Sequence, residues 1–147
     1  MKASFKYLTS LLLVAIVIQV GVAAVALFKA LDYADDNGSV TKDQIESGLD
    51  PHHIFGTVAA ALILAIFIVA FAAGMGSLMQ KLAAGLLLLG ALQFFFAWLG
   101  MQSPWLGFLH GVNALALYGA VAFLAHQAWT RPTRVAATVT GGETPTE

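Results

Sequence analysis

The sequence predicts an all-α integral membrane protein, a bundle of four transmembrane helices with both ends of the chain in the cytoplasm. Hydrophobic residues make up 59% of its 147 residues and charged residues only 10%. A soluble domain carries about 25% charged residues, so this chain has too few to cover a surface in water. The length suits one domain surrounded by the lipid bilayer. A net charge of -1 gives no basic surface for nucleic acid.

Four apolar stretches are long enough to cross a bilayer. A helix needs about 20 apolar residues to span a hydrocarbon core about 30 Å thick. The stretches that meet this length run over about 7–28, 53–73, 82–99 and 105–129, within a single domain over 1–129. The first is longer than the apolar part of a signal peptide, so we expect it to be a retained helix.

The charges that flank these stretches predict the orientation. One side collects Lys2, Lys6, Lys81, Arg131 and Arg134. The other side has only Lys29 and Lys42, together with six acidic residues between positions 32 and 50. Because lysine and arginine in short loops stay in the cytoplasm, we expect both termini inside and the loop 29–52 outside. We place the chain in an inner (plasma) membrane, that of a bacterium.

The outer loop and the C-terminal segment have their own signals. Asp36-Asn37-Gly38 is typical of a turn. Thr41 followed by Gln44 three residues later is a capping box, which predicts a short surface helix. Residues 130–147 are rich in Thr, Gly and Pro, so we expect a disordered cytoplasmic tail.

Polar residues within the predicted helices gather at one depth. Counted at about 1.5 Å per residue from the helix ends, every helix places a polar residue in the outer half of the bilayer, whereas the inner half is almost purely apolar until His126. The polar residues of the outer half are Gln19, His53, Thr57, Gln93, His110 and Asn113. Polar groups are costly in lipid and normally face the interior of a bundle. Their convergence on one layer therefore predicts a site between the helices.

Two histidines are the candidate ligands of this site. The chain has no cysteine, so its four histidines are the strong metal ligands available. His53 and His110 lie at similar depth on different helices, where they can occupy both axial positions of a haem b iron. A structural hydrogen-bonded pair, a quinone site, proton transfer and another metal are the alternatives. His52 competes with His53, since the two point about 100° apart on a helix.

Small residues near the histidines allow the helices to approach closely or a flat ligand to bind between them. Gly56 continues the His53 face, and this selects His53 over His52 as the ligand. Gly107 and Gly111 form a G-x-x-x-G pattern around His110. His126 lies near the inner interface, apart from the other histidines.

The sequence resembles one four-helix half of the heme A synthase family. The resemblance is carried by Asp50-Pro51-His52-His53 before Ile54-Phe55-Gly56, by Leu109-His110-Gly111-Val112-Asn113, and by the third-helix stretch Gly90-Ala91-Leu92-Gln93. It is similar, more closely still, to a group of short, uncharacterised bacterial four-helix membrane proteins with the same His-Gly-x-Asn step. In the family an acidic residue precedes the second-helix histidine by three positions, as Asp50 precedes His53. The resemblance implies a haem pocket at His53 and His110, bordered by Asp50, Gly56, Gln93, Gly111 and Asn113.

The leading hypothesis is a membrane haem b protein with bis-histidine ligation near the outer face, for electron transfer or haem handling. The chain would act alone, as a homodimer, or within a larger membrane complex. The alternative is a cofactor-free accessory subunit of a respiratory or transport complex, with the polar layer serving as interhelical hydrogen bonds. Ion-coupled transport is disfavoured, because the predicted helices have no acidic or basic residue in their interiors.

Overall fold

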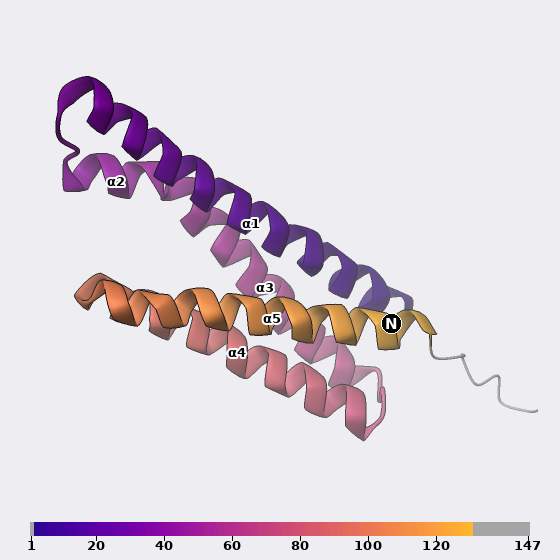
Figure 1. The fold of residues 1–147 in the computed structure, drawn as a ribbon. Coiled ribbons are helices and arrows are strands. Elements are labelled where there is room, and N and C mark those ends of the chain that lie inside the picture. Colours follow the sequence, from indigo (N-terminus) through magenta and orange to yellow (C-terminus); the bar gives the residue numbers. More distant parts are fainter. Residues whose placement is uncertain (1, 131–147) are drawn as a thin grey trace, which may run out of the picture.

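The computed structural model describes residues 2–130, which form five helices and no strand (Figure 1). The helices are α1 (Lys2–Asn37), α2 (Lys42–Gly48), α3 (Asp50–Ala72), α4 (Ser77–Gln102) and α5 (Pro104–Thr130). All except α2 are long and apolar enough to cross a membrane. The predicted all-α class with four long apolar helices is therefore confirmed, and the chain is a multi-pass membrane protein.

The long helices extend further than their apolar stretches predicted. The largest difference is in α1, which continues through residues 29–37, a segment predicted as loop. Its 36 residues span about 54 Å, more than a hydrocarbon core of about 30 Å, so its polar end projects beyond the apolar part. A helix satisfies its backbone hydrogen bonds in water as well as in lipid, so loss of hydropathy does not end it. Gly38 ends it instead, with a φ of 74° and its N–H bonded to the Ala34 carbonyl at 2.7 Å.

The short helix predicted within the loop is confirmed as α2. The Thr41 side chain accepts a hydrogen bond from the Gln44 backbone N–H, and the Gln44 side chain accepts one from the Thr41 backbone N–H. Both halves of the capping box are thus formed. The predicted tail lies outside the described residues, except for Thr130, which ends α5.

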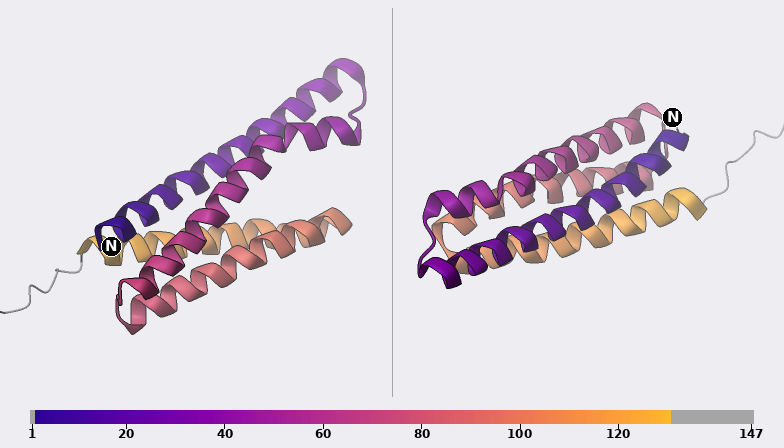
Figure 2. Two further views of the ribbon diagram at one scale, coloured as in Figure 1. Left: turned by 180° about the vertical axis from the view of Figure 1, so that it is seen from behind. Right: turned by 90° about the horizontal axis from the view of Figure 1, so that it is seen from above.

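The four long helices form two hairpins that pack against each other. The first hairpin is α1 with α3, and the second hairpin is α4 with α5. Neighbouring helices around the bundle are α1–α3, α3–α4, α4–α5 and α5–α1, whereas α3 and α5 lie on a diagonal. Helices α1 and α4 begin at the same end of the bundle (Figures 1 and 2). A half-turn about the bundle axis therefore exchanges the two hairpins.

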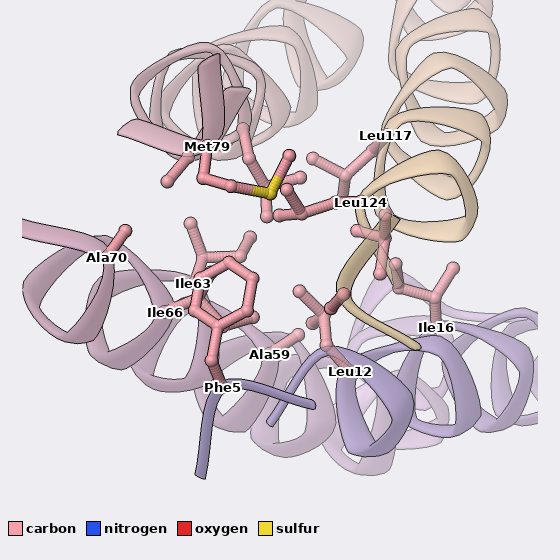
Figure 3. Close-up of a cluster of buried hydrophobic side chains, with 14 residues drawn as sticks. Phe5, Leu12, Ile16, Ala59, Ile63, Ile66, Ala70, Met79, Leu117 and Leu124 are labelled. Carbon is pink, nitrogen blue, oxygen red and sulfur yellow. The ribbon is translucent and has the colours of Figure 1, made fainter. Parts of the chain in front are cut away.

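The buried core has the same register in both hairpins. Side chains from all four long helices converge on it (Figure 3). At a constant offset in numbering, the buried residues of α1 and α4 correspond as Phe5 with Met79, Thr9 with Ala83, Leu12 with Leu86 and Ile16 with Gly90. In α3 and α5 they correspond as Ala59 with Leu117, Ile63 with Val121, Ile66 with Leu124 and Ala70 with Ala128. The steps of three and four residues are the spacing of a coiled-coil-like seam.

This core occupies one end of the bundle. At that end Trp129 of α5 closes on α1, with its ring 6.0 Å from the Tyr7 ring and its indole N–H donating to the Ser10 hydroxyl at 3.1 Å. At the other end the two hairpins diverge (Figure 1 and the left view of Figure 2). In α3, α4 and α5 the fully buried residues stop at Ala59, Gly90 and Asn113. The candidate site lies where the core gives way to this open end.

Candidate functional site

Each buried stripe ends in a polar residue at the level where the hairpins diverge. Gln19 follows Ile16 by three residues, and Gln93 follows Gly90 by three. His52 precedes Ala59 by seven residues, and His110 precedes Leu117 by seven. We call Gln19, His52, Gln93, His110 and Asn113 the polar layer; its first four residues are partly buried and Asn113 is buried. The seam that builds the core therefore also brings these side chains together.

The first hairpin holds one Gln–His pair, formed by Gln19 of α1 and His52 of α3. The Gln19 side-chain amide donates to the His52 backbone carbonyl at 2.7 Å. In return, Nδ1 of His52 lies 3.2 Å from the Gln19 backbone carbonyl. Each residue thus bonds to the backbone of the other, which fixes the register of the two helices.

The second hairpin holds an equivalent pair, formed by Gln93 of α4 and His110 of α5. The Gln93 amide donates to the His110 carbonyl at 3.2 Å, and Nδ1 of His110 lies 3.0 Å from the Gln93 carbonyl. Two further bonds occur here. The Gln93 amide nitrogen lies 3.1 Å from Nε2 of His110, and Oε1 of Gln93 accepts a bond from the Asn113 amide.

The hydrogen bonds of the second pair indicate which ring nitrogen of His110 carries a proton. The Asn113 amide nitrogen donates to the Leu89 carbonyl at 2.9 Å, which fixes the orientation of that amide. Its bond to Oε1 of Gln93 then leaves the Gln93 nitrogen to donate to Nε2 of His110. Since a carbonyl only accepts, Nδ1 of His110 carries the proton and the imidazole is neutral. The same argument puts the proton of His52 on Nδ1.

The two pairs meet through their imidazoles. The rings of His52 and His110 have centroids 6.2 Å apart and planes inclined by 61°, although α3 and α5 are diagonal helices. His53 is exposed, so the expectation that it rather than His52 faces the interior is wrong. The core stripe of α3 runs through Ala59, seven residues after His52, whereas the His53 face continues to the exposed Thr57 and Leu64.

The remaining predicted site residues, Gly56, Gly111 and Asp50, lie in different surroundings. A Cβ added to Gly56 would lie 3.0 Å from the Gln19 amide nitrogen, so this glycine makes room for the first Gln–His pair. Gly111 is exposed and a Cβ there would meet nothing within 4 Å, so it does not border the polar layer. Its predicted partner Gly107 instead packs on Gly100 of α4. Asp50 is exposed in the first turn of α3, where a carboxylate suits the positive end of the helix.

Two residues of the site received too little weight from sequence reasoning. The sequence favoured His53 over His52 as the ligand. Gln19 was predicted at the correct depth, but its hydrogen-bond partner His52 was not. The signal for both is the spacing of the core: continuing the stripe Phe5, Thr9, Leu12, Ile16 by three residues reaches Gln19. Continuing the α3 stripe backwards by seven reaches His52 rather than His53.

The arrangement offers two imidazoles, each oriented through Nδ1 by a backbone carbonyl, as metal-ligating histidines commonly are. Within residues 2–130 no three His, Cys, Asp or Glu side chains gather as a metal site. Comparisons of the chain with family models, with curated proteins and with solved structures gave no match.

Proposed function

We propose that this protein binds one haem b between His52 and His110, near the outer face of a bacterial inner membrane, for electron transfer or haem handling. The observation that carries the proposal is the 6.2 Å separation of the two imidazoles, which come from diagonal helices. These two histidines would be the residues that hold the haem.

The donor set also suits this role. Both histidines are oriented through Nδ1 by a hydrogen bond to a backbone carbonyl, as the histidine ligands of metals commonly are. A haem held by these two histidines would supply one-electron transfer. Beneath the pair, the buried residues Ile16, Ala59, Gly90 and Leu117 form an apolar layer.

The orientation belongs to the same proposal. Lys6 and Lys81 lie toward the core end of the bundle, near the start of α1 and of α4. Lys29, Lys42 and the acidic residues of α1 and α2 lie at the end where the hairpins diverge. Under the positive-inside rule, this distribution supports a core end in the cytoplasm and a polar layer near the outer face.

The test is the spectrum of the purified full-length protein. We expect a Soret band and a reduced-minus-oxidised haem b spectrum in wild type. His52→Ala and His110→Ala should each lose or shift the band, and added imidazole should restore it. His53→Ala and His126→Ala, which remove exposed histidines, are the matched controls and should leave it unchanged. A colourless wild type that stays colourless after incubation with haem would refute the proposal.

A cofactor-free accessory subunit is the second candidate. It is favoured by one observation: the second Gln–His pair satisfies its hydrogen bonds without any ligand. In that case the protein would co-purify with a larger membrane complex and carry no pigment. A coloured, monodisperse monomer or homodimer would contradict it.

A further inference from the structure

The two Gln–His pairs have the same backbone connections but leave their imidazoles in different states. In the second pair the Gln93 amide covers Nε2 of His110 at 3.1 Å. In the first pair the hydrogen bonds of His52 involve Nδ1 and the backbone carbonyl, and its Nε2 has no partner among the described residues. The lone pair that would bind a metal is thus available on His52 and occupied on His110.

One residue difference explains why Gln93 is held over its histidine. Asn113 donates to Oε1 of Gln93 and is itself fixed on the Leu89 carbonyl. At the constant offset between α3 and α5, the counterpart of Asn113 is Phe55, which has no donor. As a result Oε1 of Gln19 is buried without a hydrogen-bond partner among the described residues.

A second difference explains where the Gln19 amide goes. Its nitrogen lies against Gly56, at 3.0 Å from where a Cβ would be. The counterpart of Gly56 in α5 is Ala114, which carries a methyl group. Gly56 therefore leaves room for the Gln19 amide at the His52 carbonyl. The Gln93 amide also donates to the carbonyl of its histidine, but it lies in addition against Nε2 of His110.

We infer that the two axial ligands act in order: His52 binds the iron first, and His110 binds only after the Gln93 amide has left its Nε2. This rests on the proposed function and adds Gln93 and Asn113 as positioning residues that control the second ligand. In the second step the hydrogen bond between the Gln93 amide and Nε2 of His110 breaks, and a bond from Nε2 to iron forms. No electron is transferred, and Gln93 keeps its bond to the His110 carbonyl.

Stopped-flow binding of ferric haem to the purified apoprotein in detergent tests this order. Wild type should give two phases, a five-coordinate high-spin species followed by conversion to a six-coordinate low-spin species. Asn113→Leu and Gln93→Leu should accelerate the second phase about threefold to tenfold, because an interhelical hydrogen bond of modest strength no longer holds the amide in place. Phe55→Leu, at the counterpart of Asn113, should change neither rate by more than about twofold.

A fourth variant separates the two steps. Gly56→Ala puts a methyl group 3.0 Å from the Gln19 amide nitrogen, which must shift from its place at the His52 carbonyl, so it should slow the first phase and leave the second unchanged. A single low-spin phase in wild type, or a second phase of equal rate in Asn113→Leu and Gln93→Leu, would overturn the order while haem binding itself stands. Haem binding by none of the monodisperse proteins would instead remove the proposed function and this inference with it.

Discussion

The first and second hairpins bury equivalent residues but differ in the hydrogen bonds of their polar layers. Their cores match position for position, from Phe5 with Met79 to Ala70 with Ala128. Their polar layers match in the Gln–His pairs and differ in Asn113, which has Phe55 as its counterpart. Packing between helices in lipid depends on close contact along the whole seam, so it constrains both hairpins alike. The polar layer lies at the open end, where a residue can change without disturbing that seam.

The connections of the hairpins differ as well. In the second hairpin a single residue, Ser103, joins α4 to α5, and the helices approach closely where Gly100 meets Gly107. In the first hairpin residues 38–49 join α1 to α3 and include α2. The buried Ala26 is the counterpart of Gly100, so the first hairpin does not need a glycine there.

The largest effect that tests this comparison is expected in the core. Leu12 and Leu86 are 0% and 1% exposed at equivalent positions. Leu12→Ala and Leu86→Ala should each lower the free energy of unfolding by about 2 to 3 kcal/mol, through lost contacts and a cavity. Unfolding in mixed micelles measures both. If only one of the two variants had a lower free energy of unfolding, the two cores would be equivalent in residue position but not in energy.

The next effect is specific to the second hairpin. A Cβ on Gly100 would lie 2.8 Å from the Gly107 Cα, which is backbone and cannot turn aside. Gly100→Ala should therefore separate α4 from α5 and cost about 1 to 3 kcal/mol. Gly85→Ala on the same helix meets nothing within 4 Å and should change stability by less than about 0.5 kcal/mol. Equal stability of the two variants would contradict the close approach.

A smaller effect concerns the polar layer of the second hairpin. Asn113→Ala leaves Oε1 of Gln93 without its donor, and should cost about 1 kcal/mol, close to the usual value of an interhelical hydrogen bond in a membrane. Thr57→Ala is the control, since among the described residues the Thr57 hydroxyl bonds only to the His53 carbonyl of its own helix. An Asn113→Ala protein as stable as that control would mean that Gln93 finds another donor.

The smallest expected effect is a gain in stability from a substitution that gives the first hairpin the amide that the second hairpin has. Phe55→Asn places an amide at the counterpart of Asn113, where it can donate to the buried Oε1 of Gln19. In a double-mutant cycle with Gln19→Leu, we expect a favourable coupling of about 0.5 kcal/mol. Zero coupling would show that the geometry of the two polar layers differs more than their hydrogen bonds indicate.

Hydropathy predicted the fold because lipid imposes length and composition on a spanning helix. It could not predict where α1 ends, since residues 29–37 are polar and a helix can continue in water until a residue such as Gly38 stops it. The capping box of α2 was predictable because its two hydrogen bonds are local to Thr41 and Gln44.

The site was predictable in depth but not in direction. Gln19, Gln93, His110 and Asn113 were identified at one level because depth follows from helical rise alone. The choice between His52 and His53 depends on rotation of α3 about its axis, which the core stripe sets. The Gly56 criterion failed because Gly56 lies three residues from one histidine and four from the other, so both share a face with it. The hydrogen bond from Asn113 to Gln93 depends on how α4 packs against α5. No pattern within a single helix predicts that packing.

The long connection between α1 and α3 has a practical consequence for mapping the membrane orientation. Lengthening a flexible connection costs little, about 0.6 kcal/mol for each doubling, so a short epitope should be accepted at Ser39 between α1 and α2. The same insertion at Ser103 would force apart the helices that meet at Gly100 and Gly107. An antibody against an epitope at Ser39 would therefore report, in otherwise unmodified cells, on which side of the bilayer the open end of the bundle lies.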